Sequence, residues 1–216
     1  MSFIFPLQLN EFADGLRVRS QDWDLSENLR SSKDGAGRIL TADGGPRLWE
    51  GSIEIAPNSH PAQRQAQALA QVLRQAGASF MISDPKGKYP FADPGGVILG
   101  GAVLTLSAPI AGANTVTLVG LPEGYVLTPG DYLSYGYGPT GTKQALHQVT
   151  QGGTAADGSV TVGVVDRVRP GVDDGTEVTL IGAACKAVLV PGSFKSGRIE
   201  LDATTGYSFS FRQTLR

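Results

Sequence analysis

The stretch "HPAQRQAQALAQVLRQAG" at residues 60–77, followed by "ASFMISDPKGKYP" at 78–90, decides the fold prediction. Its apolar residues recur at spacings of three and four, which predicts one amphipathic helix with a narrow apolar stripe. The stripe consists of Ala62, Ala66, Leu69, Val72, Leu73 and Ala76. The opposite face is expected to carry Gln63, Gln67, Gln71 and Gln75. A helix with so narrow a stripe packs against a sheet or a partner.

The residues around this helix predict how it begins and ends. Asn58 or Ser59 is suited to cap the amino end, and Pro61 suits the first turn. Gly77 stands where a left-handed residue is favoured after a helix. The alternating segment that follows predicts a strand, and Asp84-Pro85 ends it.

The turn "DPKGK" at residues 84–88 raises the question of a phosphate site. A phosphate-binding loop directs several backbone N–H groups to one point, usually at a helix N-terminus. Here the turn follows a strand and precedes Pro90 and Pro94, which do not suit that geometry. We therefore interpret Lys86 and Lys88 as solvated turn residues.

Alternating patterns extend outward from this centre toward both ends of the chain. "MSFIFPLQL" at 1–9 predicts a first strand, and "RLWEGSIEIAP" at 47–57 predicts another. Residues 26–47 between them are rich in Gly, Ser and Asp, which predicts a long loop or an extended hairpin tip. At the other end, Tyr207, Phe209 and Phe211 share one face of a final strand.

Between Val97 and Ala184 the chain shows short β-type runs separated by turn signals, with no convincing helix. We predict a mainly β fold, with a β-sandwich or rolled-sheet core, one flanking α-helix and an inserted small all-β barrel. The expected division is 1–95 together with 186–216 for the discontinuous core domain, and 96–185 for the inserted peripheral module. Insertion at an exposed loop is tolerated when the termini belong to one sheet.

Composition excludes several classes of protein. The chain has 216 residues, 29 of them glycine, and a formal net charge of −2, which does not indicate a strongly basic nucleic-acid binder. The single cysteine, Cys185, excludes an intramolecular disulfide framework and is expected to be buried. No window is long and apolar enough for membrane insertion, and the start does not resemble a signal peptide. Synthesis in the cytoplasm is therefore expected.

The sequence offers little catalytic chemistry, and we expect no catalytic, cofactor-binding or metal-binding residues and no cofactor. His60 and His147 are the only histidines, and neither has an acidic partner at ligand spacing. No G-x-S-x-G motif occurs. The weakest hypothesis is a hydrolase that uses Asp173, Asp174 or Glu177, because no base, nucleophile and orienting group occur together.

Three tyrosines in "GDYLSYGYG" form the most informative polar-aromatic cluster: Tyr132, Tyr135 and Tyr137. Exposed aromatic residues stack on sugars or form the centres of protein interfaces. Burial in the core near the Gly-rich bend is the other interpretation. As peripheral-surface aromatics they support a second hypothesis, a carbohydrate-binding module that attaches to a host-surface glycan.

The order of these segments resembles a known family. "RLWEGSIEIAP", the helix, "FMISDPKGKYP", "TPGDYLSYGYG", "ADGSVTVGVV" and "YSFSFRQTL" together are similar to the distal tail proteins of long-tailed bacteriophages and gene-transfer agents. The resemblance implies a tail-tube-like core and a structural virion protein, located in the virion tail after assembly in the host bacterial cytoplasm. It implies a homo-oligomer, a hexameric ring, that contacts the tail tube protein and baseplate hub or fibre proteins. The ring surrounds the DNA ejection channel, so that DNA passes close to it without specific binding.

Under this resemblance the long segment 26–47 is expected to lie between subunits. A loop of this length without a core of its own is usually functional. The candidate intersubunit residues are Asp34, Arg38, Arg47 and Trp49. Deleting residues 32–44 is therefore predicted to leave the monomer folded and to weaken oligomerisation.

Overall fold

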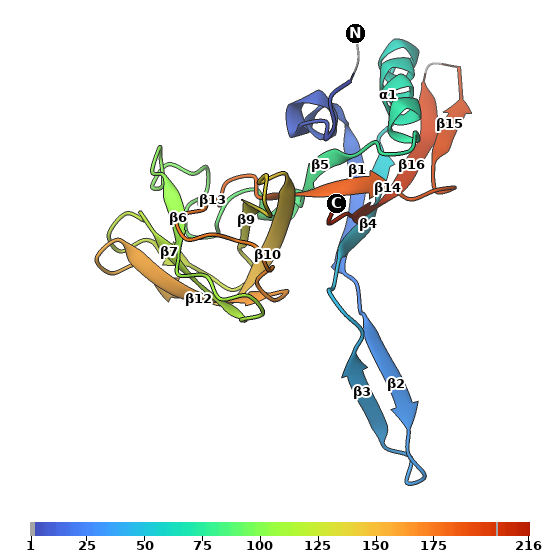
Figure 1. Cartoon of the computed structure of the whole chain (residues 1–216). Coiled ribbons are helices and arrows are strands. Elements are labelled where there is room, and N and C mark those ends of the chain that lie inside the picture. The colour runs from blue at the N-terminus through green and yellow to red at the C-terminus, as the bar shows by residue number, and fades with distance from the viewer. Residues whose placement is uncertain (1–2, 202) are drawn as a thin grey trace.

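The computed structural model describes residues 3–201 and 203–216. The chain is mainly β, and it consists of a curled sheet with a helix, a closed barrel and a protruding two-stranded arm (Figure 1). The predicted fold class, a rolled-sheet core with one flanking helix plus a small all-β barrel, is therefore confirmed.

The sheet has six strands, and all of its pairings are antiparallel. Its strand order is β1-β4-β16-β14-β5, with β15 beside β16. The strands are β1 (Val18–Leu25), β4 (Trp49–Ile55), β5 (Phe80–Ser83), β14 (Ala184–Leu189), β15 (Lys195–Ile199) and β16 (Thr204–Gln213). Both ends of the chain thus contribute to one sheet. The predicted boundary between residues 185 and 186 falls inside β14.

The helix α1 (His60–Leu73) lies against this sheet. Ala70 and Leu73 belong to the sheet's hydrophobic core, and the Tyr207 hydroxyl donates to the Ala66 carbonyl over 3.3 Å. The helix ends earlier than expected, so that Ala76 is exposed, and Gln63, expected on the polar face, is buried. The physical reason is that the helix is rotated about its axis relative to the expected orientation. Residues seven apart lie on one helix face, so Gln63 shares the buried face of Ala70. Within the described residues, no helix has the length and apolar character of a membrane span.

The barrel closes in the order β10-β12-β7-β6-β13-β9. Its strands are β6 (Leu104–Ser107), β7 (Thr115–Val119), β9 (Tyr132–Tyr137), β10 (Lys143–Gln151), β12 (Ser159–Val165) and β13 (Glu177–Thr179), and β8 (Val126–Leu127) pairs with β11 (Gly153–Thr154) beside it. All of these strands lie between β5 and β14 in the sequence. Since Ser83 pairs with Ala184, the chain leaves the sheet and returns to it at neighbouring positions.

The prediction of a first strand at residues 1–9 is wrong for residues 3–9. Met1 and Ser2, which the prediction also includes, lie outside the described residues. Leu7 alone pairs with Phe80, since Pro6 has no N–H with which to continue a ladder. The Gln8 backbone N–H then donates to the Glu11 carboxylate over 2.7 Å. This bond starts two short 3₁₀ turns, η1 (Leu9–Glu11) and η2 (Ala13–Gly15), in place of a strand.

The segment predicted as a long loop or an extended hairpin is a hairpin. It consists of β2 (Leu29–Lys33) and β3 (Ile39–Asp43), which pair in register from Leu29 opposite Asp43 to Lys33 opposite Ile39. The hairpin extends away from both the sheet and the barrel (Figure 1).

Candidate functional site

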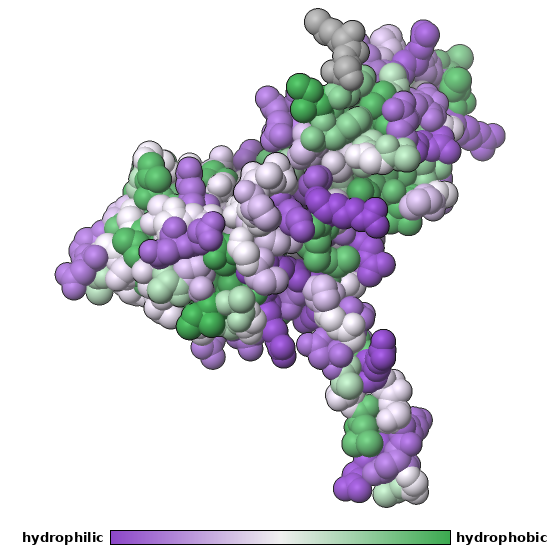
Figure 2. Space-filling view, in the orientation of Figure 1, coloured by the Kyte–Doolittle hydropathy of each residue, from purple (hydrophilic) through white to green (hydrophobic). Residues whose placement is uncertain are grey.

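Residues 26–47, which we call the arm, expose apolar side chains that the rest of the described chain does not cover. Every residue of β2 and β3 is exposed. Leu29, Ile39 and Leu40 are 57 %, 65 % and 56 % exposed, and hydrophobic residues lie among hydrophilic ones along the arm (Figure 2). A two-stranded hairpin alone is marginally stable in water. The arm therefore gains little stability from its own two strands and leaves its apolar side chains open to solvent.

The tip of the arm is held by Asp34. Its Oδ1 accepts the backbone N–H groups of Ala36 and Arg38 over 2.9 and 2.8 Å, and its Oδ2 accepts Arg38 Nε–H over 2.8 Å. The bond from the Arg38 backbone N–H is the main cause that lowers the pKa of the Asp34 carboxyl. Asp34 and Arg38 thus contact each other within one chain, and both remain at the surface of the tip.

The base of the arm is fastened to the barrel by charged residues that are largely buried. Arg47 donates its guanidinium N–H groups to the carbonyls of Leu25 and Ser26, each over 3.0 Å. Its backbone N–H donates to Asp166 Oδ2 over 3.0 Å, and its carbonyl accepts from Arg169 over 3.0 Å. Asp166 also pairs with Arg169 over 3.2 Å. These contacts fix the direction in which the arm leaves the body.

A half-open pocket of about 590 Å³, lined by both polar and apolar residues, lies between the arm base and the barrel. An ion pair of Arg167 and Asp43, 3.7 Å apart, also joins the two parts. Both side chains are more than half exposed, and an exposed pair of this kind adds little stability. The partly buried contacts of Arg47 therefore determine the geometry of the base.

Two of the predicted intersubunit residues, Arg47 and Trp49, make contacts within the chain. Arg47 is occupied by the base contacts described above. Trp49 is buried, and its indole Nε1–H donates to the Leu146 carbonyl of β10 over 2.9 Å. The prediction for Trp49 is wrong, because the alternation of β4 places it on the face that the barrel covers. Arg47 is only partly buried, and its intersubunit role stays a prediction.

The prediction that Tyr132, Tyr135 and Tyr137 lie on the peripheral surface is also wrong, because all three are buried. Tyr132 belongs to the core of the sheet, whereas Tyr135 and Tyr137 belong to the core of the barrel. The Tyr132 hydroxyl donates to Asp84 Oδ2 over 3.1 Å, and burial raises the pKa of Tyr135 to about 12. Because β9 forms part of the junction, its two faces both meet a hydrophobic core.

His147 is buried within the barrel and has a structural role. Its Nδ1 lies 2.8 Å from the Asp166 carbonyl, which only accepts, so Nδ1 carries the proton. Its Nε2 then accepts the hydroxyl of Tyr135 over 2.9 Å. Burial lowers the pKa of His147 to about 4.

The other candidates for chemistry lie apart from one another. His60 hydrogen-bonds Thr204 over 3.0 Å, and burial raises the pKa of the Cys185 thiol. No cluster of three or more metal-ligating side chains occurs in the described part of the chain. Asp173, Asp174 and Glu177 are exposed in and beside a turn, where Asp174 accepts the Ala108 backbone N–H over 2.7 Å.

The "DPKGK" turn is a corner held by the barrel. The Asp84 carboxylate accepts the Lys86 backbone N–H over 3.0 Å and caps the turn η3 (Pro85–Gly87). A Cβ at Gly87 would lie 2.2 Å from the Tyr132 ring, so the corner requires glycine there. Lys86 and Lys88 are exposed.

Sequence reasoning missed Asp166 and Arg169, although the run "VGVVDRVRP" places charges in an otherwise apolar strand end. Such charges are rarely buried unless they are paired, and that is the signal by which they could have been found. No family model matches the chain, and a search of curated proteins gives no match.

Proposed function

We propose that the chain is a structural virion protein that assembles through its arm into a ring hub at the distal end of a bacteriophage tail. The ring joins the tail tube to baseplate or fibre proteins and surrounds the DNA ejection channel. The chain acts by assembly and carries out no catalysis. Support comes from the order of the sequence segments, which resembles distal tail proteins, and above all from the exposed arm.

The arm supports assembly because it combines exposed apolar residues with a fixed direction. Fully burying a Leu or Ile side chain is worth roughly 1.5–3 kcal/mol, so Leu29, Ile39 and Leu40 provide a driving force once a neighbour covers them. The partly buried contacts of Arg47 hold the arm in one direction before it meets that neighbour. A preorganised segment loses less entropy on binding than a flexible one.

Light scattering on the purified chain, over a range of concentration and salt, tests this proposal. The full chain is expected to form a species of about six copies. In the matched variant an Asn-Gly turn replaces residues 31–41 and joins Arg30 to Ala42, which are paired across the arm. This variant keeps the arm base and is expected to be a folded monomer. A variant that assembles as the full chain does would refute the role of the arm.

Point variants identify the face of the arm that makes the contact. Leu29 and Ile39 lie on one face, and Leu40 lies on the other, because side chains alternate along a strand. Replacing Leu29 and Ile39 by serine is compared with replacing Leu40 alone. The face whose loss lowers the oligomer mass is the one that the neighbour covers.

A carbohydrate-binding module for host-surface attachment is the alternative function. Its original support was the predicted exposure of Tyr132, Tyr135 and Tyr137, which are buried. A glycan array probed with the whole chain tests it, and uniformly flat signals would remove it.

A further inference from the structure

An open groove of about 670 Å³ lies where the corner after β5 meets the loop between β8 and β9. Its apolar lining includes Tyr89 and Phe91, and Phe91 is 81 % exposed. Lys86 and Lys88 lie at its edge, and neither forms an ion pair with another described residue. The groove therefore combines exposed aromatic surface with positive charge.

Buried aspartates hold the loops of this groove in place. Asp131 accepts the backbone N–H of Phe91 over 2.8 Å and that of Thr128 over 2.7 Å. Asp93 accepts the backbone N–H groups of Ile98 and Leu99, each over 2.9 Å. Asp131 lines the groove too, but its carboxylate is buried and hydrogen-bonded, so Lys86 and Lys88 are the exposed charged side chains of the lining. Phe91 is thus held outward by a preorganised loop and is exposed without an occupant from this chain.

Exposed apolar side chains flank an exposed acidic residue where β15 ends and the turn to β16 begins. Ile199 and Leu201 are 80 % and 94 % exposed, and neither belongs to a hydrophobic core. Glu200 lies between them and is exposed. The next residue in the sequence is a further acid, Asp202, which lies outside the described residues. We call residues 199–201 the acidic turn.

We propose that the groove at Tyr89 and Phe91 binds the acidic turn of a second copy of this chain. The side chains of Ile199 and Leu201 would cover the aromatic surface, and Glu200 would pair with Lys86 or Lys88. The argument for this occupant is complementarity of both hydrophobicity and charge between two exposed surfaces of one sequence. A sugar fits less well, because the carboxylate and hydroxyl groups of Asp131 and Thr128 are already bonded to each other and to the backbone.

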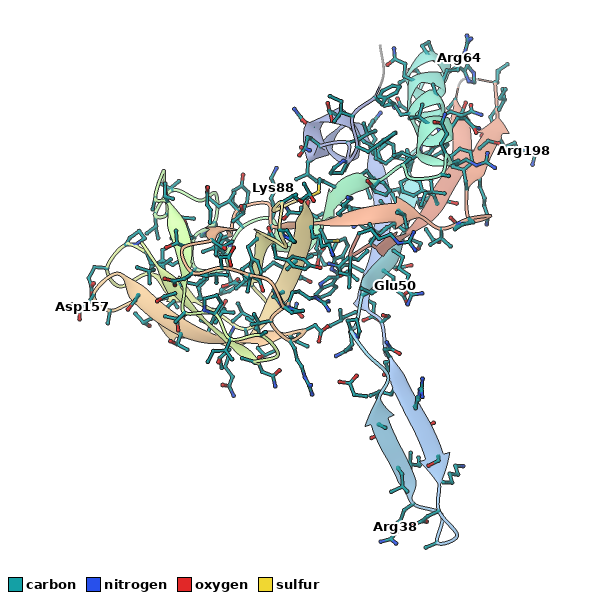
Figure 3. The ribbon with its side chains drawn as sticks, in the orientation of Figure 1. Arg38, Glu50, Arg64, Lys88, Asp157 and Arg198 are labelled. Carbon is teal, nitrogen blue, oxygen red and sulfur yellow. The ribbon has the colours of Figure 1, made fainter. Side chains whose placement is uncertain are left out.

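The two surfaces are placed for a head-to-tail contact. Lys88 lies at the junction of sheet and barrel, whereas Arg198, beside the acidic turn, lies at the outer end of the sheet (Figure 3). One chain therefore offers the groove to one neighbour and the turn to another. Such heterologous contacts generate closed rings when the rotation between copies closes. This inference rests on the proposed ring and names a second contact within it.

Charge reversal with light scattering tests the contact. Lys88→Glu and Glu200→Lys are each expected to weaken assembly by about tenfold in dissociation constant. The double variant restores opposite charges between positions 88 and 200 at every interface and is expected to recover assembly. Arg64→Glu and Glu123→Lys, exposed and without hydrogen-bond partners among the described residues, are the matched controls and should assemble normally. The variant in which an Asn-Gly turn replaces residues 31–41 of the arm is measured in parallel.

A photo-reactive amino acid in place of Leu201 gives a second, direct readout. Its cross-link is expected in residues 85–95 or 128–131 of another copy. If the chain assembles but the single reversals have no effect, or if the double variant does not recover, this contact is wrong and the ring proposal stands. Cross-links to any other surface overturn it in the same way. A chain that stays monomeric at every concentration, with no cross-link, overturns both proposals.

Discussion

Trp49 of β4 donates its indole N–H to the carbonyl of Leu146 in β10 over 2.9 Å, and this bond joins the sheet to the barrel. Leu146 and Tyr132 come from barrel strands, yet both belong to the hydrophobic core of the sheet. The Ala184 backbone N–H adds a bond to the Ser134 hydroxyl over 3.3 Å. We expect the sheet and the barrel to unfold as one cooperative unit.

Trp49→Phe removes this bond and keeps most of the aromatic bulk. The Leu146 carbonyl then loses a buried donor, which costs about 1–3 kcal/mol of unfolding free energy. Urea unfolding followed by far-UV circular dichroism measures the loss. Trp23→Phe is the control, because the Trp23 indole N–H has no partner among the described residues. An equal loss in both variants would mean that the bond to Leu146 contributes nothing specific.

Stability is expected to fall as the pH is lowered from 6.5 to 4. Burial lowers the pKa of His147 from 6.5 to about 4, so in this range the unfolded chain binds a proton that the folded chain does not. The destabilisation is absent above pH 6.5 and complete below pH 4, where it reaches about 3 kcal/mol. Urea midpoints measured across this pH range test it.

His147→Asn separates this effect from that of the carboxylates. The variant is expected to be less stable at pH 7, because Tyr135 loses its acceptor. It should also lack the part of the pH dependence between 6.5 and 4 that belongs to the imidazole. An unchanged slope in the variant would assign the acid sensitivity to other groups.

Asp166→Asn is expected to loosen the arm. The substitution leaves the largely buried Arg169 guanidinium without its charge partner, and breaking such a pair costs about 3 kcal/mol. Spin labels at Ala36→Cys and Asp157→Cys report the distance between arm tip and barrel, and buried Cys185 is protected from labelling. The distance distribution should broaden in the Asn variant. Arg19→Gln breaks an exposed pair with Glu54 and should leave the distribution unchanged.

Gly87→Ala is expected to destabilise the corner by about 1–3 kcal/mol, because the added methyl group would overlap the Tyr132 ring. Gly15→Ala is the matched control, since nothing lies within 4 Å of its Cβ position. Urea unfolding of both variants provides the comparison. A loss at Gly87 no larger than at Gly15 would show that Tyr132 moves aside freely.

The helix and the hairpin were predictable because their signals are local. Leu69, Val72 and Leu73 repeat at helical spacing, and the Gly-rich segment between two alternating runs indicates a chain reversal. The final strand was equally predictable, because Tyr207, Phe209 and Phe211 alternate in the sequence. All three are buried in the structure. The helix end was less predictable, because packing decides which face turns inward.

The contacts of the junction were not predictable, because they join residues far apart in sequence. Arg47 meets Asp166 across 119 positions, and no short motif encodes such a pairing. Alternation places Tyr135 and Tyr137 on one face of a strand but does not reveal that this face lines a closed barrel. The same limitation applies to Trp49, whose exposure depends on whether a second core covers β4.

The pairing of Ser83 with Ala184 has a consequence for how such a protein can diversify. β5 and β14 pair as the two strands of one hairpin, and the whole barrel takes the place of the loop that joins them. The register of the two strands does not depend on the structure of that loop. A different cassette could be grafted at the same two positions without altering the order of the sheet strands. Its compatibility would depend on covering the Trp49 indole and offering it an acceptor.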